Sequence, residues 1–422
     1  MKRRKRKVRK LKIGRVMIAL GLLVLICLVI IYLFKDDEGA VNHHTTEKSN
    51  NVYEKNIEKE EEKTYSVSVI TAGDNLIHSS IYKDASVGYN EYDFKPMYEL
   101  IKPIVSKYDI AYYNQETILG GKELGVADYP TFNSPQEVGD AMIDAGFNLV
   151  SLATNHTMDS GERAVLKSRE YWNSKTDVMA VGSYSSFEER DKVVIATKNN
   201  ISYTMLNYTY GTNGIAVPKG KEYLVNVWPT DLDINDPDKD DAYQAYKSQV
   251  KTDVDRVRDK VDVLIVAMHW GVEYTHEPTA YEKDMAKYLA SLGVDVIIGT
   301  HPHVIQPIEW IDNTLVIYSL GNFISAQYQN QGTCLNYKCM TGLMTRFDIE
   351  KTVKGKKTEI KIKNINNELI YTYYSSWRNF KVIPFSNSMI KDKLYGYQNV
   401  YDTYKDVVIK YDKTIPVAEC YQ

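Results

Sequence analysis

The amino-acid sequence predicts an α/β fold, and three observations support that prediction. From Tyr65 onward, short apolar runs of strand length alternate with longer amphipathic segments of helical length. Hydrophobic residues make up 44% of the chain, as in an ordinary globular protein. The length of 422 residues is enough for one large domain or two smaller ones with a substantial core.

The first 34 residues suggest a membrane anchor rather than part of this domain. Residues 1–15 contain ten Lys or Arg and no acid, and residues 16–34 are uncharged over a length that can cross the apolar core of a bilayer. A basic flank resists translocation, so we expect a cytoplasmic tail and a single-pass anchor in the cell membrane. No small-x-small cleavage site follows, which favours an uncleaved signal anchor over a cleaved signal peptide.

Residues 35–64 are rich in Glu, Lys and Asn and almost lack aliphatic side chains. Such a segment cannot bury enough apolar surface to offset the entropy of ordering, so we expect a disordered stalk. The domain beyond the stalk would then be extracellular. Because the basic excess is confined to residues 1–15, we expect no nucleic acid among its partners.

Residues 65–341 form the predicted main domain, in which apolar runs bounded by polar turns predict strands. These strands are Ser66–Ala72, Asp109–Tyr113, Asn148–Ala153, Asp177–Val181, Val193–Ala196, Ser202–Asn207, Val261–Met268, Val294–Ile298 and Leu315–Leu320. Amphipathic segments between them predict helices at Asp93–Lys107, Arg163–Trp172, Ala242–Lys260 and Tyr281–Leu292. A further helix is expected to start with Ser134 as N-cap and Glu137 completing a capping box.

Residues 342–422 show a different pattern, with strand-like pieces at Leu343–Ile349 and Glu359–Ile365. We predict a strand-rich extension that packs on the main domain. Just before it, Cys334 and Cys339 could close a small loop in an oxidising exterior, and a pair of reduced thiols is the alternative.

Five of the eight histidines lie just beyond the carboxyl ends of predicted strands, namely His78, His156, His269, His301 and His303. If the segment after residue 298 is extended, His301 and His303 face the same side because they are two residues apart. Ligand sites of open α/β sheets lie at the carboxyl ends of the strands, and imidazole is a common metal ligand. The pattern therefore predicts a metal or acid–base site.

Acidic and amide side chains follow the same strands, at Asp74, Glu116, Asn155 and Asp159. Two divalent cations about 4 Å apart need a bridging carboxylate with imidazole and carbonyl ligands around it. A histidine oriented by a carboxylate can protonate a leaving oxygen. Simpler roles stay open, because Asn155 and Asp159 are also residue types that cap helices.

Six ordered motifs over residues 66–325 carry a resemblance to a known family. They are Gly73-Asp74, Asn114-x-Glu116, Asn155-His156-x-x-Asp159-x-Gly161, His269-Trp270-Gly271-x-Glu273, His301-Pro302-His303-x-x-Gln306 and Gly321-Asn322-Phe323. Together they resemble the bacterial capsule-synthesis family CapA (PgsA), which serves poly-γ-glutamate production and is related to calcineurin-like metallophosphatases. The resemblance implies a metallophosphatase-like four-layer sandwich, in which helices flank two packed mixed β-sheets.

The resemblance also implies roles for individual residues. The metal ligands would be Asp74, Glu116, Asn155, His269, His301 and His303, with Glu116 in the place of a bridging aspartate. His156 would be the catalytic histidine, with Asp159 as its partner. The metallophosphatases carry a further histidine where this chain has Leu76, and His78 is either its substitute or a surface residue. Glu273 and Asn322 are further possible site residues.

The resulting hypothesis is a membrane-anchored, extracellular, metal-dependent hydrolase or transferase of capsule biosynthesis. It would hold one or two divalent ions (Mn, Fe or Zn), use a metal-bound water and employ His156 as general acid. Expected partners are the cell membrane, an anionic polymer such as poly-γ-glutamate and other capsule-synthase subunits. The alternatives are a non-catalytic capsule-complex subunit that binds or exports the polyanion, and a surface phosphoesterase unrelated to capsules.

Overall fold

The computed structural model describes residues 61–228, 240–327, 334 and 337–422. The predicted basic tail, membrane anchor and most of the predicted stalk lie outside the described residues. Within the described part of the chain, no helix is both long and apolar enough to cross a membrane.

Strand β1 (Glu62–Asn75) lies in the middle of an eight-stranded mixed sheet. It pairs in parallel with β4 (Ile110–Gln115) and antiparallel with β14 (Thr341–Lys354). The sheet order is β16-β15-β14-β1-β4-β5-β6, with β13 beside β1. The remaining strands are β5 (Leu149–Ser151), β6 (Met179–Val181), β13 (Asn322–Ile324), β15 (Lys357–Ser375) and β16 (Arg378–Pro384).

The second sheet has six strands in the order β11-β12-β10-β9-β8-β7. Its four central strands run parallel, while β7 (Ala196–Lys198) and β11 (Ile308–Ile311) pair antiparallel at its two edges. The central strands are β8 (Ile201–Thr209), β9 (Val263–His269), β10 (Val296–Thr300) and β12 (Thr314–Ile317). A separate two-stranded hairpin joins β2 (Ser86–Gly88) to β3 (Glu91–Tyr92).

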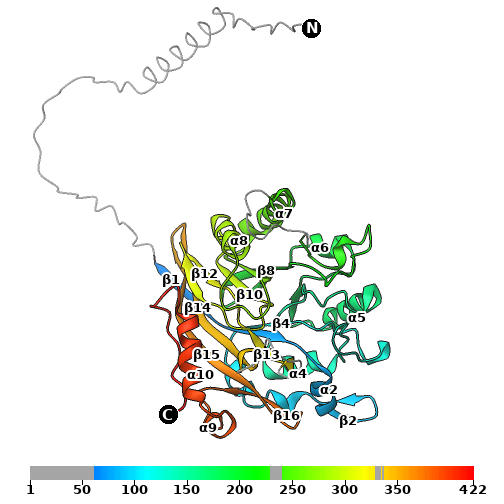
Figure 1. The fold of residues 1–422 in the computed structure, drawn as a ribbon. Helices are drawn as coiled ribbons and strands as arrows, with labels where there is room; N and C mark the ends of the chain where they lie inside the picture. Colours follow the sequence, from blue (N-terminus) through cyan, green and yellow to red (C-terminus); the bar gives the residue numbers. More distant parts are fainter. Residues whose placement is uncertain (1–60, 229–239, 328–333, 335–336) are drawn as a thin grey trace, which may run out of the picture. The chain divides into compact units, whose positions relative to one another are not determined.

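The two sheets pack face to face, and helices cover their outer faces (Figure 1). In β1, Val67 and Val69 belong to the core between the sheets, whereas Ile70 and Ala72 belong to the core under the helices, as the two-residue period of a strand requires. The first sheet is covered mainly by α4 (Glu137–Ala145) and α5 (Gly161–Asn173), and the second by α7 (Asp241–Val257) and α8 (Ala280–Ser291). The predicted α/β class is confirmed as mixed sheets with flanking helices.

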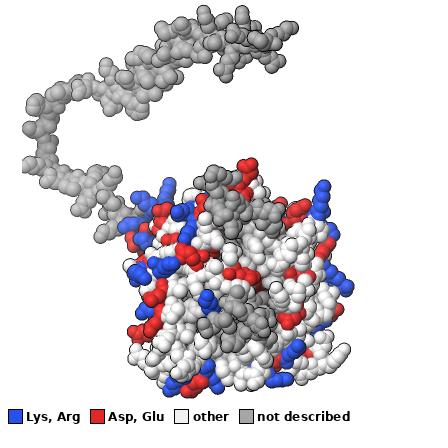
Figure 2. Space-filling view, viewed as in Figure 1, with Lys and Arg blue, Asp and Glu red and all other residues white. Residues whose placement is uncertain are grey.

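Five further α-helices lie in the described residues. They are α2 (Ser79–Asp84), α3 (Lys102–Val105), α6 (Phe187–Asp191), α9 (Ile390–Lys393) and α10 (Tyr397–Val408). Helix α10 contributes Tyr401, Tyr404 and Val408 to the core between the sheets. On the face shown in Figure 2, acidic and basic side chains of the described residues are interspersed.

Two predicted helix features are wrong. Instead of a helix over Asp93–Lys107, the structure has a single 3-10 turn at Lys95–Met97 and the short α3, because Pro96 and Pro103 lack an N–H and restrict the residue before them. Ser134 is no N-cap: α4 begins at Glu137, and the Ser134 hydroxyl donates to Thr117 Oγ1 at 2.9 Å.

Two boundaries also differ from the prediction. Residues 62–64, the end of the predicted stalk, belong to β1 because their polar side chains do not prevent backbone pairing with β14. The strand predicted at Val193–Ala196 lies later, as β7, where Ala196–Lys198 pair with the start of β8.

Candidate metal centre

The predicted site residues come together at one edge of both sheets. Asp74 is near the end of β1, Glu116 directly follows β4, and His269 ends β9. The loops after β5 and β10 carry the others, which are Asn155, His156, His301 and His303. Because parallel strands end at the same edge, segments far apart in sequence meet there.

Glycine allows the close approach that brings these segments together. A Cβ on Gly73 would lie 1.8 Å from the carbonyl oxygen of Gly321, far closer than two non-bonded atoms can approach. The residues next to this contact are Asp74 and Asn322, which are register partners in β1 and β13. The glycines therefore allow the Asp74 and Asn322 segments to share one site.

Glu116, His301 and His303 form the centre of the cluster, with one ligand atom of each within 4.8 Å of the others. The Glu116 carboxylate is fully buried, and neither of its oxygens has a hydrogen-bond partner among the residues that the structure describes. His301 Nδ1 is also buried without a partner in this described part of the chain. A buried carboxylate without a donor is costly, and a divalent cation would offset that cost with ligand types that Mn, Fe and Zn accept. The residues therefore fit a metal ion.

Two further predicted ligands border this group. His269 Nε2 lies 3.8 Å from Glu116 Oε1 and 2.9 Å from Asn155 Oδ1. Asp74 Oδ2 lies 3.5 Å from His303 Nδ1 and accepts from the His301 N–H at 3.2 Å. Asn155 therefore contacts a predicted ligand instead of capping α5.

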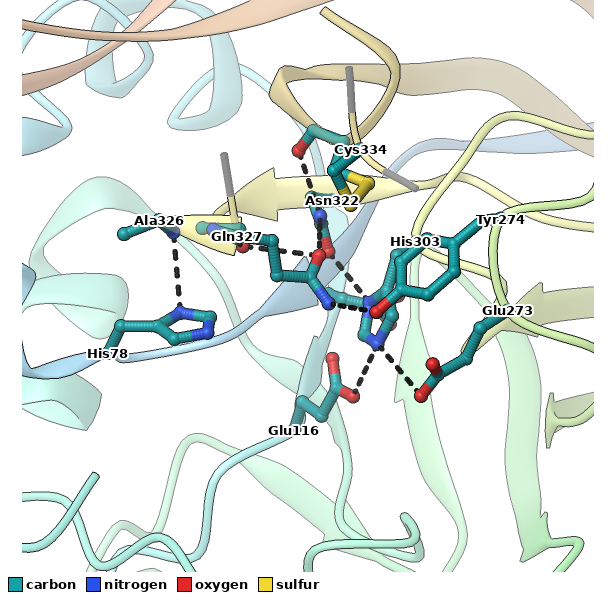
Figure 3. Close-up of a disulfide and its surroundings, with 12 residues drawn as sticks. His78, Glu116, Glu273, Tyr274, His303, Asn322, Ala326, Gln327 and Cys334 are labelled. Atoms are coloured by element: carbon teal, nitrogen blue, oxygen red, sulfur yellow. Dashed lines mark hydrogen bonds and ion pairs between the residues drawn. A yellow bond between two sulfur atoms is a disulfide. The ribbon is translucent and has the colours of Figure 1, made fainter. Parts of the chain in front are cut away.

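His303 is oriented by Asn322 (Figure 3). Asn322 Nδ2 donates to the Gln327 side chain and to the Cys339 carbonyl, so its Oδ1 faces His303 Nδ1 at 3.0 Å. This contact leaves His303 Nε2 directed at Glu116 Oε1, 3.6 Å away. Asn322 thus orients a candidate ligand, as outer groups of metal sites do.

The burial of these groups shifts their pKa values. Burial lowers the pKa of His269 and of His301 well below the usual range, so both rings are neutral at pH 7 and keep a lone pair for a cation. Burial also raises the pKa of Glu116. Burial lowers the pKa of His303. The nearby Glu116 and Asp74 carboxylates favour the charged ring more strongly and raise this pKa to about 10.

The backbone at the two central histidines differs from the expected extended chain. His301 and His303 have φ of +99° and +58°, in the left-handed region that residues with a Cβ rarely adopt. Such strain is found at functional sites, where the surrounding structure enforces it. The two rings still converge, at 5.7 Å between centroids, but through a turn after β10 instead of an extended strand.

His156 and Asp159, the predicted catalytic pair, lie beside the centre. His156 Nδ1 is 2.7 Å from Asp159 Oδ2, and the same oxygen accepts from the Phe132 N–H at 2.7 Å. His156 lines a hollow of about 230 Å³ that His303 also lines. Asp159 therefore holds His156 at the same cavity as a candidate metal ligand.

The remaining possible residues have distinct positions. His78 lines the same hollow, with Nδ1 3.3 Å from both the Leu76 carbonyl and the Ala326 N–H, and it is not one of the three converging groups. Glu273 Oε1 lies 4.0 Å from His303 Nε2, and its side chain is 42% exposed. His78 and Glu273 therefore line the same cavity but are not among the three converging groups.

Sequence reasoning assigned no role to several residues that support the centre. Asn114 donates to Asp74 Oδ1 at 2.8 Å, Thr300 Oγ1 lies 3.0 Å from His269 Nδ1, and the Tyr210 ring lies 4.4 Å from the His301 ring. Tyr210 directly follows β8, so its position after a parallel strand could have identified it. Cys334 and Cys339 form a disulfide, and Cys334 lines the hollow.

The layers and the convergent side chains define an α/β/β/α protein with a buried carboxylate–imidazole centre. The model of a family described as bacterial capsule synthesis protein PGA_cap matches residues 68–327, more than half of the chain. The chain belongs to this family.

Two curated relatives agree with this assignment. The PGA biosynthesis protein CapA of Bacillus subtilis (strain 168) is 28% identical over 247 residues, covering 56% of this chain and 60% of that protein. The capsule biosynthesis protein CapA of Bacillus anthracis is 27% identical over 195 residues, covering 46% and 44%. The chain thus matches about half of each relative's length.

Among solved structures, a 5'-nucleotidase from Candida albicans SC5314 is 12% identical, with a TM-score of 0.35 over 66% of this chain and 46% of that one. A hypothetical protein from Thermus thermophilus is 14% identical, with a TM-score of 0.37 over 71% and 98%. These likenesses are too low to support any conclusion about activity.

Proposed function

We propose that this protein is a metal-dependent hydrolase or transferase of capsule biosynthesis with a metallophosphatase-like domain. The observation that carries the proposal is the Glu116 carboxylate, which is buried without a donor and surrounded by the imidazoles of His269, His301 and His303. The names of the two relatives support the capsule role, and the PGA biosynthesis protein supports poly-γ-glutamate or a precursor as substrate.

Glu116, His301 and His303 would hold the first ion, with Asp74, Asn155 and His269 near enough to complete the set. A bound divalent cation supplies positive charge for an anionic group and lowers the pKa of water. On the protein side, Asp159 fixes His156 through Nδ1, which leaves Nε2 for the cavity. A protonated His156 can give its Nε2 proton to a leaving oxygen in this cavity, while Asp159 holds the His156 ring in position.

Residues 16–34 support a membrane anchor, and the topology proposed here is an extracellular domain behind a cytoplasmic tail. Membrane, polymer and other synthase subunits are the proposed partners. Alkaline phosphatase fused after residue 422 would be active outside the cell if this topology holds, and inactive if the domain stays in the cytoplasm.

Metal analysis of the purified full chain tests the function. We expect near-stoichiometric Mn, Fe or Zn, lost together with capsule formation in His301→Ala. His156→Ala should keep the metal but lose capsule formation, because His156 moves a proton and is not among the converging ligand groups. If His156→Ala retains both, the protein is a non-catalytic capsule subunit and the enzyme proposal is wrong. Loss of phosphoesterase activity without a capsule defect would indicate the unrelated esterase.

A further inference from the structure

A second hollow lies beside the first turn of α2, separate from the metal centre. It has a volume of about 350 Å³ and is lined by Ser79, Ser80, Lys83, Asp84, Ser376, Trp377 and Arg378. Helix α2 follows His78 directly, and no residue that lines this hollow also lines the cavity of His78. None of the lining residues belongs to the candidate metal centre.

Trp377 is presented by a strained turn. Ser375 pairs with Arg378 across the β15–β16 hairpin, which leaves Ser376 and Trp377 as its two central residues. Their φ values are +51° and +60°, a combination that hairpins normally satisfy with Asn-Gly. A tryptophan in left-handed backbone costs free energy, and such outliers are a reason to look for a function.

The indole of Trp377 forms the end of an aromatic stack. One face packs on Tyr374 at 4.4 Å and 17°, and Tyr374 in turn stacks on Phe380 at 5.0 Å. The Trp377 side chain nevertheless stays 39% exposed. The stack therefore holds a flat ring rigidly at the wall of the hollow.

One acidic and two basic side chains lie around this ring, and the acidic one is held in place. Asp84 accepts from the backbone N–H groups of Asn379 and Phe380, both at 2.9 Å, which fastens the hairpin to α2. Among the described residues, this carboxylate forms no ion pair with Lys83 or Arg378. Lys83 and Arg378 have no ion pair with any residue that the structure describes.

Hydroxyl groups complete the wall. Ser79 and Ser376 line the hollow, and so does Ser80, whose buried hydroxyl has no hydrogen-bond partner in the described part of the chain. A rigid indole face suits the C–H face of a sugar ring, since the face of an aromatic ring is negative and the C–H hydrogens are weakly positive. Two unpaired cations next to it favour a carboxylate.

We propose that this hollow binds an acidic saccharide, a sugar ring that bears a carboxylate. The ring stacks on Trp377, and Arg378 and Lys83 bind the carboxylate. The inference does not depend on the proposed hydrolase activity, because it uses no residue of the metal centre. A γ-linked glutamate chain shares the carboxylate but has no ring, so it would gain nothing from the indole.

Titration of the full chain with trigalacturonate, monitored by calorimetry, tests this site. Maltotriose, a neutral trisaccharide, and γ-linked triglutamate serve as comparison ligands. We expect trigalacturonate to bind at least tenfold more tightly than either. Trp377→Asn should weaken binding at least tenfold while keeping the turn, because Asn tolerates left-handed backbone. Arg378→Ala should also weaken it, whereas Tyr395→Ala, which removes an exposed aromatic elsewhere, should not.

Three results would overturn the proposal. One is the absence of trigalacturonate binding at millimolar concentration. Another is binding that Trp377→Asn and Arg378→Ala leave unchanged although both variants keep the thermal unfolding midpoint of the parent. The third is equal or tighter binding of triglutamate with the same dependence on Trp377, which would make the peptide polymer the occupant.

Discussion

Single buried groups at the centre set the strongest expectations at the residue scale. The Glu116 carboxylate has no donor within the described chain, while His303 is held by Asn322 on its far side. Glu116 would contribute negative charge to a bound cation. The Asn322–His303 contact would fix the direction of the His303 ring. Substitution can separate these two contributions.

Replacing Glu116 by Gln should abolish metal binding while the chain still folds, because the amide keeps the shape but not the charge. A cation that binds only the folded state raises its stability by mass action, by about 2.7 kcal/mol at a hundredfold excess over the dissociation constant. Added Mn²⁺ or Zn²⁺ should therefore raise the thermal midpoint of the parent and not of Glu116→Gln. The matched control is Glu359→Gln, at an exposed position of β15. If added metal raises the thermal midpoint of Glu116→Gln as much as that of the parent, Glu116 is not a ligand.

Replacing Asn322 by Ala should weaken metal binding by about tenfold to a hundredfold, the usual effect of removing a group that orients a ligand. The reason is that His303 Nδ1 loses its 3.0 Å contact and the ring can turn away from Glu116. Competition with a chromogenic chelator measures the change. Asn399→Ala, at an exposed position of α10, is the control, and unchanged affinity in Asn322→Ala would make the contact irrelevant to the metal.

The sequence was sufficient to identify residues that follow strands and carry strong ligand chemistry. The position of Tyr210 directly after β8 could have marked it as a candidate, but the sequence could not show which rings Tyr210 and Thr300 face after folding. It also could not show that His301 and His303 adopt positive φ, because that strain is imposed by the surrounding backbone. Tertiary packing, more than local pattern, decides such details.

At the element scale, strands were easier to predict than helix starts. Strands β9 and β10 are buried throughout and mostly apolar, so their pattern is clear from sequence. Around Pro96 and Pro103 the apolar spacing suggested one helix, but the missing N–H groups break it into two short turns. Strand β15 continues well beyond its predicted end because pairing with β14 and β16 supports its polar residues.

Helix α8 carries a capping box with an unusual carboxyl group. Thr279 accepts from the Glu282 N–H at 3.2 Å, and Glu282 accepts from the Thr279 N–H at 2.6 Å. Burial outweighs these bonds and raises the pKa of Glu282 from 4.5 to about 7. A carboxyl that holds its proton more tightly when folded favours the folded state at low pH, and this contribution is lost as pH rises from about 4.5 to 7.

Glu282→Gln should therefore become more stable relative to the parent as pH rises through this window, by up to about 3 kcal/mol. Urea unfolding of both chains at pH 5 and pH 8 measures the difference. Thr279→Ala is a useful comparison, since the loss of the N-cap hydroxyl should cost about 1 kcal/mol. A difference between Glu282→Gln and the parent that does not change with pH would show that Glu282 titrates normally.

At the scale of the whole molecule, β14 is part of the main sheet and not an appendage to it. It pairs with β1 along ten residues of each strand, although the family match ends at residue 327. A Cβ on Gly342 would lie 1.9 Å from the Asn322 carbonyl oxygen, so β14 also lies directly behind the residue that orients His303. The segment after residue 341 therefore supports both the core and the site.

Truncation tests this dependence. A chain of residues 61–422 should unfold cooperatively and bind metal, whereas a chain of residues 61–341 should do neither. In the shorter chain, β1 would lose its antiparallel neighbour, and the core between the sheets would lose Leu343, Phe347 and Ile349. Fully burying a side chain such as Leu or Phe is worth about 1.5–3 kcal/mol, so the loss of three is comparable to the whole stability of a domain. Thermal unfolding followed by circular dichroism, together with metal analysis, compares the two chains. If residues 61–341 unfold cooperatively and retain metal, the first sheet is stable without β14 and the site does not depend on it.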